Sequence, residues 1–518
     1  MSIACCIDNN SINCSKAFLN FIYDFTFKIT LEKVKFYIIL RCCKFHLLVN
    51  FFHFHSTINS HFSYAKHINI WALDNHYFHG FNLKNLFLTF YYNILKINFC
   101  YNVIFERKIV FIVAARYLFL CDEDFTILEN QAFVFEDKIL ELGELDNLKK
   151  KYPKAKIIKT PKNSVILPAF INPHTHLEFS ANSTTLHFGE FLIWLKSVIN
   201  SRSILNAQAK EELILQSIKK MQKSGIGTIG EISSFGSDLD PCLKASHKGM
   251  RIVFFNEILG TNENQVEDKK QEFLKRFENS LKFKNDFFIP AISIHSPYST
   301  HPSLAYFALD LAKKQNLLAS THFLESKAEN IWLRESKGGF KKWLENFTLH
   351  PKPLYTPKDF VKLFKGVRTL FTHCVYLKEY EWLDKNLHSI THCAFSNRLL
   401  SQKSLDLKTA LKSGLNIHLG TDGLSSNISL SLLDEMRANL LIHKNFDLLE
   451  LASKLLQMVT LYPARALNLN LGELKKGKIA DFSVFELGEC DKKQAPLQFI
   501  LNAKEVDKLF IKGKECKF

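Results

Sequence analysis

The chain has 518 residues, of which 47% are hydrophobic and 23% are charged, and its formal net charge is +16. This length accommodates two or three domains, or one large α/β barrel with a smaller companion, and the composition is that of a globular protein. The positive charge is scattered and forms no basic stripe with exposed aromatic residues, so nucleic-acid binding is not expected, whereas an anionic substrate is compatible. No window reaches about 18 uncharged apolar residues, which argues against a membrane-spanning helix.

Residues 1–109 differ in composition from the rest of the chain. They contain no proline and one glycine, Gly80, and show neither a sustained hydrophobic period nor clear helix caps. They also lack the ordered regions of a signal peptide. We expect this segment not to be a folded domain. The preferred hypothesis is a translated AT-rich leader with a non-AUG start near Val110, since the first methionine after Met1 is Met221; a disordered or membrane-touching extension is the alternative.

Twelve cysteines are divided six and six between residues 1–109 and the remainder, and none forms a CxxC pattern. Without an export signal, they indicate reduced thiols and a cytoplasmic location. Cys374 and Cys393 each follow a histidine directly. At both positions a small buried thiol is favoured over a metal ligand.

From Val110 onward, short apolar runs alternate with polar turns. FIVAARYLFL, AFVFEDKILELG and KAKIIKTP are typical of short strands, and so are GELKKGKIADFSVFELG and VDKLFIKGKECKF near the C-terminus. We therefore predict a small β-sandwich lobe built from two segments, residues 110–164 and 469–518, that flank the main domain.

Between these flanks, eight apolar strand-like runs alternate with longer amphipathic stretches. The runs are SVILPAFINPH, GTIGEISS, RIVFFNEIL, FIPAISIHS, LLASTHFLES, RTLFTHCVY, HSITHCAFS and NIHLGTDGLS. Near-continuous apolar strands that alternate with helices indicate a parallel sheet, and eight repeats indicate an α/β fold of the (β/α)₈ TIM barrel type. The predicted barrel spans residues 165–468, with VILPAFI as its first strand and the active site at the carboxyl ends of the strands.

Four potential metal ligands follow predicted strands. His174 and His176 are two residues apart, so both imidazoles can face the same side of a strand. His322 lies in the fifth run and Asp422 in the eighth. Each alone has an ordinary alternative, a core histidine or a helix-capping aspartate. Together, three neutral imidazoles and one carboxylate suit Zn²⁺ or Fe²⁺ and leave room for a water.

Two further side chains are candidates for moving or holding a proton at this site. Glu325 lies three residues beyond His322 and can carry a proton from a water to a leaving amine. His373, at the end of the sixth run, can hold or polarise the same water. A surface glutamate and a buried neutral histidine are the alternatives.

These motifs resemble the amidohydrolase superfamily, in its branch of mononuclear-metal aminohydrolases, from about Phe111 to the C-terminus. The similar segments are INPHTHLE, HSPYSTHP, THFLES, THCVY, FSNRLLS, GTDGLSSN, YPARALNLNLGELKKGKIADF and both β flanks. The resemblance implies a (β/α)₈ hydrolase and contact of His295 with the substrate base. It also implies metal binding by His174, His176, His322 and Asp422, with catalysis by Glu325, His373 and Asp422. No lysine follows the fourth run in a bridging position, which implies one divalent metal ion.

The resemblance further implies hydrolytic deamination of an adenine-containing nucleoside. The loops LHFGEFLIWLKSVI, ESKAENIWLRESKGGF and FSNRLLS are similar to those of bacterial deaminases that convert 6-amino-6-deoxyfutalosine to futalosine in menaquinone synthesis. The carboxylate of that substrate would suit Arg398 or Arg334. Glu190 is a candidate contact to the nucleoside, and Trp194 lies on the same helix face, where simple helix packing is the alternative.

Other assignments stay open. They are a deaminase of the S-adenosylhomocysteine, methylthioadenosine or adenosine type, a chlorohydrolase of the same branch and, in a different class, a metal-free scaffold protein. The expected partners are a small-molecule purine nucleoside and, as an open alternative to a monomer, a second copy of the chain in a homo-oligomer, with neither nucleic acid nor membrane.

Overall fold

The computed structural model describes residues 109–182, 186–201, 206–346 and 349–517, together with six strands within residues 3–72. The chain divides into two units, Met1–Arg107 and Lys108–Phe518. The strands of the first unit form one sheet in the order β2-β1-β3-β4-β5, with β6 paired to β4. They are β1 (Ile3–Asp8), β2 (Ser11–Ile12), β3 (Asp24–Leu31), β4 (Val34–Cys43), β5 (His46–Leu48) and β6 (Ile70–Ala72). The expectation that residues 1–109 are a leader stays a prediction, because most of that segment lies outside the described residues.

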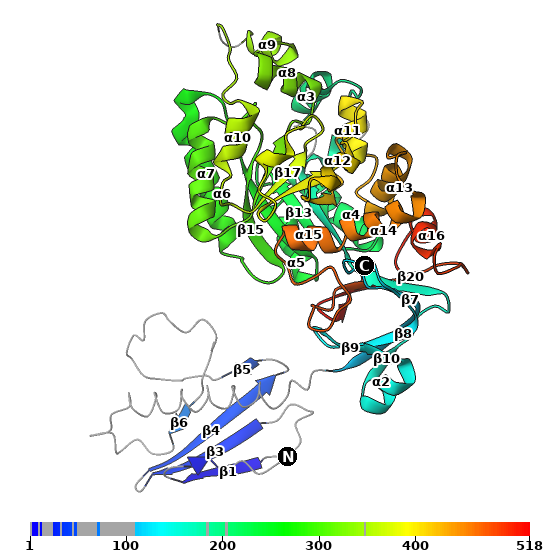
Figure 1. Ribbon diagram of the computed structural model, residues 1–518. Coiled ribbons are helices and arrows are strands. Elements are labelled where there is room, and N and C mark those ends of the chain that lie inside the picture. The colour runs from blue at the N-terminus through cyan, green and yellow to red at the C-terminus, as the bar shows by residue number, and fades with distance from the viewer. Residues whose placement is uncertain are drawn as a thin grey trace. The chain divides into compact units, whose positions relative to one another are not determined.

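The centre of the second unit is an eight-stranded parallel sheet whose strands follow chain order. Figure 1 labels three of its strands, β13, β15 and β17, in the middle of the unit. They are β12 (Phe170–Thr175), β13 (Ile226–Ser233), β14 (Arg251–Ile258), β15 (Phe288–Ile294), β16 (Ala319–Phe323), β17 (Thr369–His373), β18 (His388–His392) and β19 (Asn416–Leu419). The first and last strands meet at their carboxyl ends, where the Asp422 N–H donates to the His174 carbonyl oxygen at 3.1 Å. The predicted (β/α)₈ barrel is confirmed.

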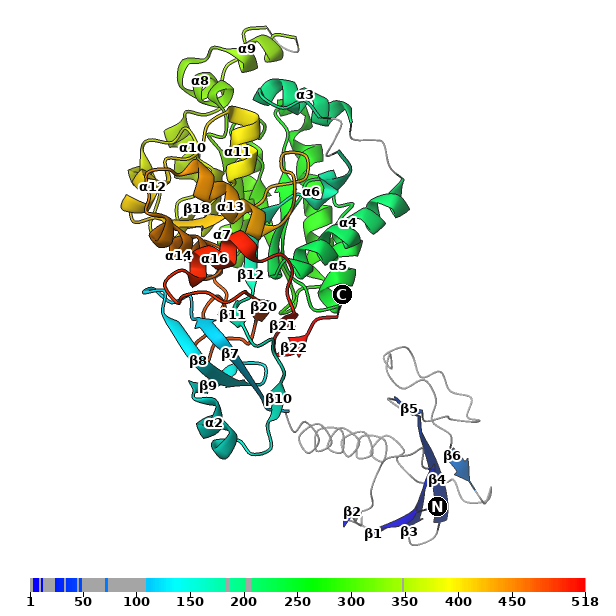
Figure 2. The ribbon, with the colours of Figure 1, turned by 90° about the vertical axis from the view of Figure 1, so that its right-hand side faces the viewer.

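Helices surround this barrel, and α3, α8, α9 and α11 lie at the end opposite the lobe (Figures 1 and 2). The helices are α2 (Leu145–Lys151), α3 (Phe191–Asn200), α4 (Ala207–Lys223), α5 (Leu239–His247), α6 (Val266–Leu281), α7 (Pro302–Gln315), α8 (Lys327–Glu335), α9 (Gly339–Leu344), α10 (Pro357–Leu363), α11 (Ala394–Ser401), α12 (Leu407–Lys412), α13 (Leu432–Ile442), α14 (Leu448–Met458), α15 (Leu461–Ala466) and α16 (Ala495–Asn502). Short 3₁₀ turns are η1 (Leu177–Asn182), η2 (Glu263–Gln265) and η3 (Tyr380–Trp382). Among the described residues, no helix is both long enough and apolar enough to cross a membrane.

The two β flanks join in one eight-stranded sheet in the order β22-β21-β20-β11-β7-β8-β9, with β10 paired to β7. Its strands are β7 (Phe111–Phe119), β8 (Ile127–Phe135), β9 (Ile139–Gly143), β10 (Lys156–Ile158), β11 (Ser164–Pro168), β20 (Phe482–Glu486), β21 (Lys508–Ile511) and β22 (Lys514–Glu515). The ring of Phe482 lies 5.0 Å from that of Phe133 and 4.9 Å from that of Phe135, between centroids. Because two strands separate β20 from β8 in the sheet, these contacts require the sheet to fold over its own core, as predicted for the lobe.

The boundary between lobe and barrel differs from the prediction. The interpretation of VILPAFI as one barrel strand was wrong, because Val165–Pro168 pair with β20 and β7 in the lobe. The first barrel strand begins at Phe170. Since the residues on both sides of Ala169 are buried, hydrophobicity runs on without a break while the chain passes from one sheet to the other.

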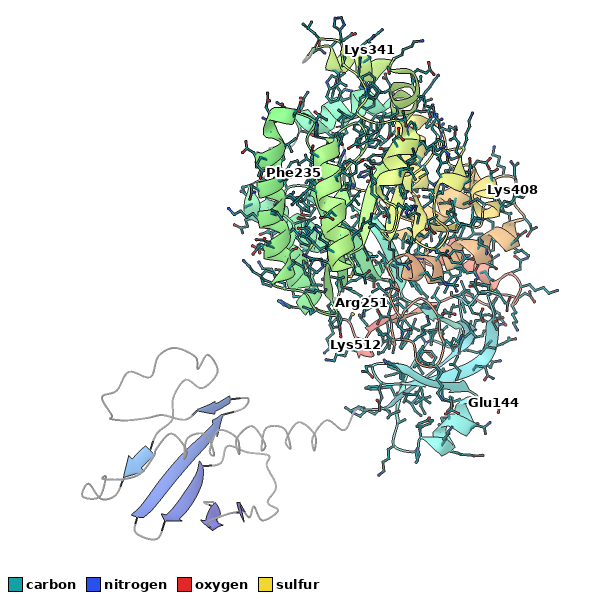
Figure 3. The ribbon with its side chains drawn as sticks, turned by 60° about the vertical axis from the view of Figure 1, so that its left-hand side comes forward. Glu144, Phe235, Arg251, Lys341, Lys408 and Lys512 are labelled. Atoms are coloured by element: carbon teal, nitrogen blue, oxygen red, sulfur yellow. The ribbon has the colours of Figure 1, made fainter. Side chains whose placement is uncertain are left out.

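A buried ion pair links the barrel to the lobe. Arg251 of β14 pairs with Asp481, which precedes β20, and their side chains are 2% and 4% exposed. Asp481 also accepts a hydrogen bond from the Lys512 N–H at 2.7 Å. Figure 3 labels Arg251 and Lys512 close to each other at the lower end of the barrel.

We expect Asp481→Ala to lower the free energy of unfolding by about 3–5 kcal/mol, because it leaves a buried guanidinium without its counter-charge. The drop is measured by urea denaturation. Lys149→Ala is the control, since Lys149 pairs with Asp146 at side-chain exposures of 41% and 85% and such exposed pairs contribute little. A loss no larger than that of the control would contradict the prediction.

Candidate active site

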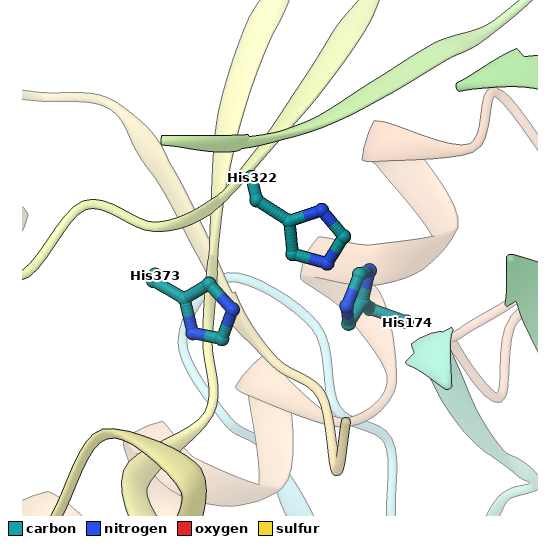
Figure 4. Close-up of side chains that lie close together, drawn as sticks. All are labelled: His174, His322 and His373. Atoms are coloured by element: carbon teal, nitrogen blue, oxygen red, sulfur yellow. The ribbon is translucent and has the colours of Figure 1, made fainter. Parts of the chain in front are cut away.

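Three histidines and one aspartate converge at the carboxyl ends of β12, β16 and β19. His176 Nε2 lies 3.1 Å from His322 Nε2, and Asp422 Oδ1 lies 3.8 Å from His174 Nε2 and 3.5 Å from His176 Nε2. Figure 4 shows the imidazoles of His174, His322 and His373 gathered around one point. The four residues predicted as metal ligands are therefore brought together.

The donor set fits a divalent cation. The Nδ1–H of His322 donates to the His295 carbonyl oxygen at 2.9 Å, so Nε2 of His322 carries a lone pair that faces His176 Nε2. His174 Nε2 is buried and has no hydrogen-bond partner among the described residues. A cation between the two Nε2 atoms could accept a lone pair from each of these neutral imidazoles. Two ligands of a tetrahedral zinc ion stand about 3.4 Å apart, close to the observed separation.

The electrostatics place these groups in the protonation states that bind metals. Burial lowers the pKa of His174 far below its ordinary value and that of His176 to about 3. Burial also opposes ionisation of Asp422, but the surrounding imidazoles, His176 first, outweigh it and hold its pKa below the usual range. Neutral imidazoles and a charged carboxylate are the forms that coordinate a cation.

Hydrogen bonds hold the Asp422 carboxylate in place. Ser396 Oγ and Ser426 Oγ donate to Asp422 Oδ2 at 2.7 and 2.8 Å, and the Gly423 N–H donates to Oδ1 at 2.8 Å. Asp422 itself has a φ of 60°, a conformation that non-glycine residues rarely adopt. Sequence reasoning missed the two serines, whose only signal was their position inside FSNRLLS and GTDGLSSN.

Glu325 is buried beside this group, with Oε1 3.5 Å from His373 Nε2. The Glu329 carboxylate accepts hydrogen bonds from the N–H groups of Leu324 and Glu325 at 3.0 and 2.8 Å, which fixes the turn that carries Glu325. Burial, with the charges of Asp422 and Glu329, raises the pKa of Glu325 well above its ordinary value. A carboxyl group that can hold a proton near neutral pH is suited to general acid–base work.

His373 has a strained backbone. Its φ is 75°, and the Cys374 N–H donates to the Thr372 carbonyl oxygen at 3.2 Å, as in a γ-turn. Such conformations cost about 1–3 kcal/mol and concentrate at functional sites. Here the turn directs Nε2 toward Asp422 Oδ2, at 3.9 Å, while burial lowers the pKa of His373 to about 4.

Two further side chains lie close to His322. The ring of His295, which follows β15, is 5.1 Å from that of His322 between centroids. Glu257 of β14 has a carboxylate oxygen within 4.8 Å of ligand atoms of both histidines, and it accepts a hydrogen bond from Ser234 Oγ at 2.6 Å. Sequence reasoning missed Glu257, because nothing in the apolar run RIVFFNEIL distinguished it from a surface residue.

The predicted substrate contacts differ in their surroundings. The Trp194 indole N–H donates to the Ser425 carbonyl oxygen at 2.7 Å, which ties α3 to the loop after Asp422. Glu190, directly before α3, and Arg398, on α11, are exposed. Arg334 forms two hydrogen bonds with the Glu379 carboxylate at 3.0 and 2.8 Å, an ion pair that argues against its predicted role in binding the substrate.

The two cysteines beside the site are buried free thiols. Burial raises the pKa of Cys374 and of Cys393 well above the ordinary value. Neither belongs to a group of potential metal ligands among the described residues. Both thiols are buried, as the sequence predicted.

Comparisons with known proteins agree with this architecture. Residues 165–516 match the amidohydrolase family. The aminodeoxyfutalosine deaminase of Nitratiruptor sp. is 40% identical over 395 residues, which cover 75% of this chain and 96% of that protein. The adenosine deaminase of Helicobacter pylori is 42% identical over 414 residues, 78% of this chain and 98% of that protein.

Solved structures with a similar fold also match most of this chain. Helicobacter pylori aminofutalosine deaminase in complex with methylthio-coformycin matches with a TM-score of 0.72 and 40% identity, over 78% of this chain and 99% of that one. An adenosine deaminase from Xanthomonas campestris with bound zinc matches at 18% identity with a TM-score of 0.65, over 78% of this chain and 92% of that one, and shows the shared fold. With its barrel, its flanking lobe and its histidines and aspartate at the strand ends, this chain belongs to the amidohydrolase family.

Proposed function

We propose that the protein is a metal-dependent deaminase of an adenine-containing nucleoside, and that it converts 6-amino-6-deoxyfutalosine to futalosine and ammonia in menaquinone synthesis. The observation that carries the reaction type is the buried Glu325 carboxyl beside His373 and Asp422, 3.5 Å from the His373 Nε2. The relative named aminodeoxyfutalosine deaminase supports the choice of substrate.

The metal ligands in this proposal are His174, His176, His322 and Asp422, which would hold one zinc or iron ion. When bound, the ion supplies Lewis acidity that lowers the pKa of a water at the site. His373 accepts a hydrogen bond from the attacking water and sets its direction. The raised pKa of Glu325 lets its carboxyl group hold a proton between the two transfers described next.

In the proposed reaction, water adds to the ring carbon that bears the amino group. Glu325 takes one proton from the water and delivers it to the amino nitrogen, and the carbon–nitrogen bond then breaks to release ammonia. His295 contacts the purine base, next to His322. The other relatives leave the nucleoside open, since they include an adenosine deaminase and, at 30% identity, a 5'-deoxyadenosine deaminase of Methanococcus vannielii.

A direct test compares substrates. The purified, metal-loaded protein is incubated with 6-amino-6-deoxyfutalosine, adenosine, S-adenosylhomocysteine and methylthioadenosine while ammonia release is followed. We expect the highest kcat/KM for 6-amino-6-deoxyfutalosine. Turnover of a chlorotriazine or an amide, with no ammonia from any purine, would overturn the deaminase assignment, and a protein that binds no transition metal would favour a scaffold.

Arg398 provides a prediction about substrate choice. Its exposed guanidinium has no ion pair or hydrogen bond in the part of the chain that the structure describes, so it is available for the carboxylate of 6-amino-6-deoxyfutalosine. We expect Arg398→Ala to raise KM for that substrate roughly 10–100-fold, the size of a lost charge-assisted hydrogen bond. KM for adenosine, which has no carboxylate, should not change.

The matched control is Arg334→Ala, because Arg334 is already paired with Glu379. It should leave both KM values within about twofold, as expected for a partly exposed ion pair. An equal rise in KM for 6-amino-6-deoxyfutalosine and for adenosine in Arg398→Ala would show that Arg398 does not bind the carboxylate.

A further inference from the structure

A chain of hydrogen bonds leads from His373 away from the active site. His373 Nδ1 and Asn397 Oδ1 are 2.8 Å apart, Asn397 Nδ2 and His392 Nδ1 are 3.1 Å apart, and His392 Nε2 and His443 Nε2 are 3.1 Å apart. The first three residues are fully buried and His443 is 9% exposed. None of Asn397, His392 and His443 has a part in the proposed chemistry.

The direction of each hydrogen bond follows from the one before. Asn397 turns its oxygen to His373, which must therefore donate from Nδ1. The Asn397 NH₂ then donates to His392 Nδ1, so a neutral His392 carries its proton on Nε2 and donates to His443. Burial keeps His392 neutral by lowering its pKa far below the ordinary value. Every donor in the chain points away from the active site.

The surroundings of His443, at the outer end of the chain of hydrogen bonds, explain why the donors point outward. With Nε2 of His443 accepting from His392, a neutral His443 carries its proton on Nδ1. Burial lowers the pKa of His443 to about 4, but the Asp406 carboxylate, which caps α12, acts in the opposite sense. A negative charge at the outer end favours hydrogen-bond dipoles whose donors point outward. If the Asn397 amide were reversed, the donors of this chain would point inward, and the hydrogen-bond dipoles would be unfavourably oriented toward the Asp406 charge.

We propose that Asn397, His392 and His443 are positioning residues that hold His373 in the tautomer whose Nε2 accepts a hydrogen bond from the attacking water. The proposal rests on the deaminase function proposed above. An N–H at this position would instead donate to the water oxygen and occupy the lone pair that must attack the purine. Because an amide does not release its protons at neutral pH, the chain sets the polarity of His373 and does not conduct protons.

Two substitutions at one position test the inner end. Asn397→Asp keeps an oxygen that accepts from His373 Nδ1, whereas Asn397→Leu keeps the approximate volume and removes the acceptor. We expect Asn397→Leu to lower kcat roughly 10–100-fold with KM and metal content unchanged, the size of one lost hydrogen bond to a buried group. Asn397→Asp should restore kcat to within about fivefold of the wild type. Equal losses in both variants, or loss of metal, would overturn the proposal.

The outer end is tested at His443, and His388 is the matched control. Both are buried histidines with hydrogen bonds, but His388 bonds to the Phe364 carbonyl oxygen and the Asp384 N–H at the amino end of β18, away from His373. We expect His443→Phe to lower kcat roughly 3–10-fold with KM and metal content unchanged, a loss of about one hydrogen bond's net contribution, and His388→Phe to leave kcat unchanged. Equal kcat values in the two variants would overturn the proposal.

The tautomer can also be read without turnover, which separates this proposal from the proposed function. Side-chain ¹⁵N labelling of histidine in the zinc-loaded protein gives a signal for His373, identified by its absence in His373→Phe. A protonated Nδ1 is expected in the wild type. A protonated Nε2 would overturn the proposal even in an active deaminase, whereas a protonated Nδ1 in a protein inactive on all purines would confirm the tautomer that the chain imposes on His373 and remove the assigned reaction.

Discussion

Glu325→Gln is expected to lower kcat by about 10²–10⁴-fold while the bound metal stays at its wild-type level. The amide fills the same space but cannot take a proton from the water and pass it to the amino nitrogen. Glu325 is buried, and the backbone at Leu324 and Glu325 is held by Glu329, so the substitution leaves the turn intact. Steady-state ammonia release and metal analysis of the same preparation provide the measurement.

The control for this variant is Glu335→Gln at the end of α8, where an exposed carboxylate takes no part in the site. It should retain full activity. If Glu325→Gln is equally active, the assigned proton carrier is wrong. If Glu325→Gln instead loses the metal, Glu325 belongs to the metal-binding group and not to proton transfer alone.

His322→Ala is expected to remove both the bound metal and measurable deamination. The substitution deletes one of the four proposed ligands and leaves His176 Nε2 without the group that faces it at 3.1 Å. Loss of residues that merely orient ligands already costs about 10–100-fold in metal affinity, so loss of a ligand should cost more than about 100-fold. Metal content after dialysis and the gain in Tm on adding Zn²⁺ or Fe²⁺ are the readouts, because a metal that binds the folded state stabilises it.

A matched control for His322→Ala is His418→Gln in β19. His418 is a fully buried histidine that bonds to Ser389 Oγ at 3.1 Å and belongs to no group of potential metal ligands among the described residues. The His418→Gln variant should keep its bound metal. Chelation of the wild-type protein should abolish activity, and restoration with each ion separately would identify the metal. Full metal content in His322→Ala would contradict the ligand assignment.

Most of the fold could be predicted from the amino-acid sequence, because barrel strands are buried on both faces. Eight nearly continuous apolar runs, each separated by an amphipathic stretch, leave few alternatives to a parallel barrel. The same property concealed the boundary at Ala169, since hydrophobicity reports that a residue is buried but not which sheet buries it. Thus β11 was assigned to the barrel although it pairs with β20, more than 300 residues later in the chain.

For the site, the sequence by itself determined which side chains are candidates for metal binding and proton transfer. His174, His176, His322 and Asp422 lie at strand ends, and a parallel barrel gathers those ends at one rim. Only the tertiary structure decided the partners of the candidate side chains. Ser396 and Ser426 donate hydrogen bonds to Asp422. Asn397 bonds to His373, and Glu379 forms an ion pair with Arg334. The physical reason is that a hydrogen bond or an ion pair depends on a few tenths of an ångström between residues far apart in the chain. Strand periodicity determines the rim at which a side chain lies but not its partner there.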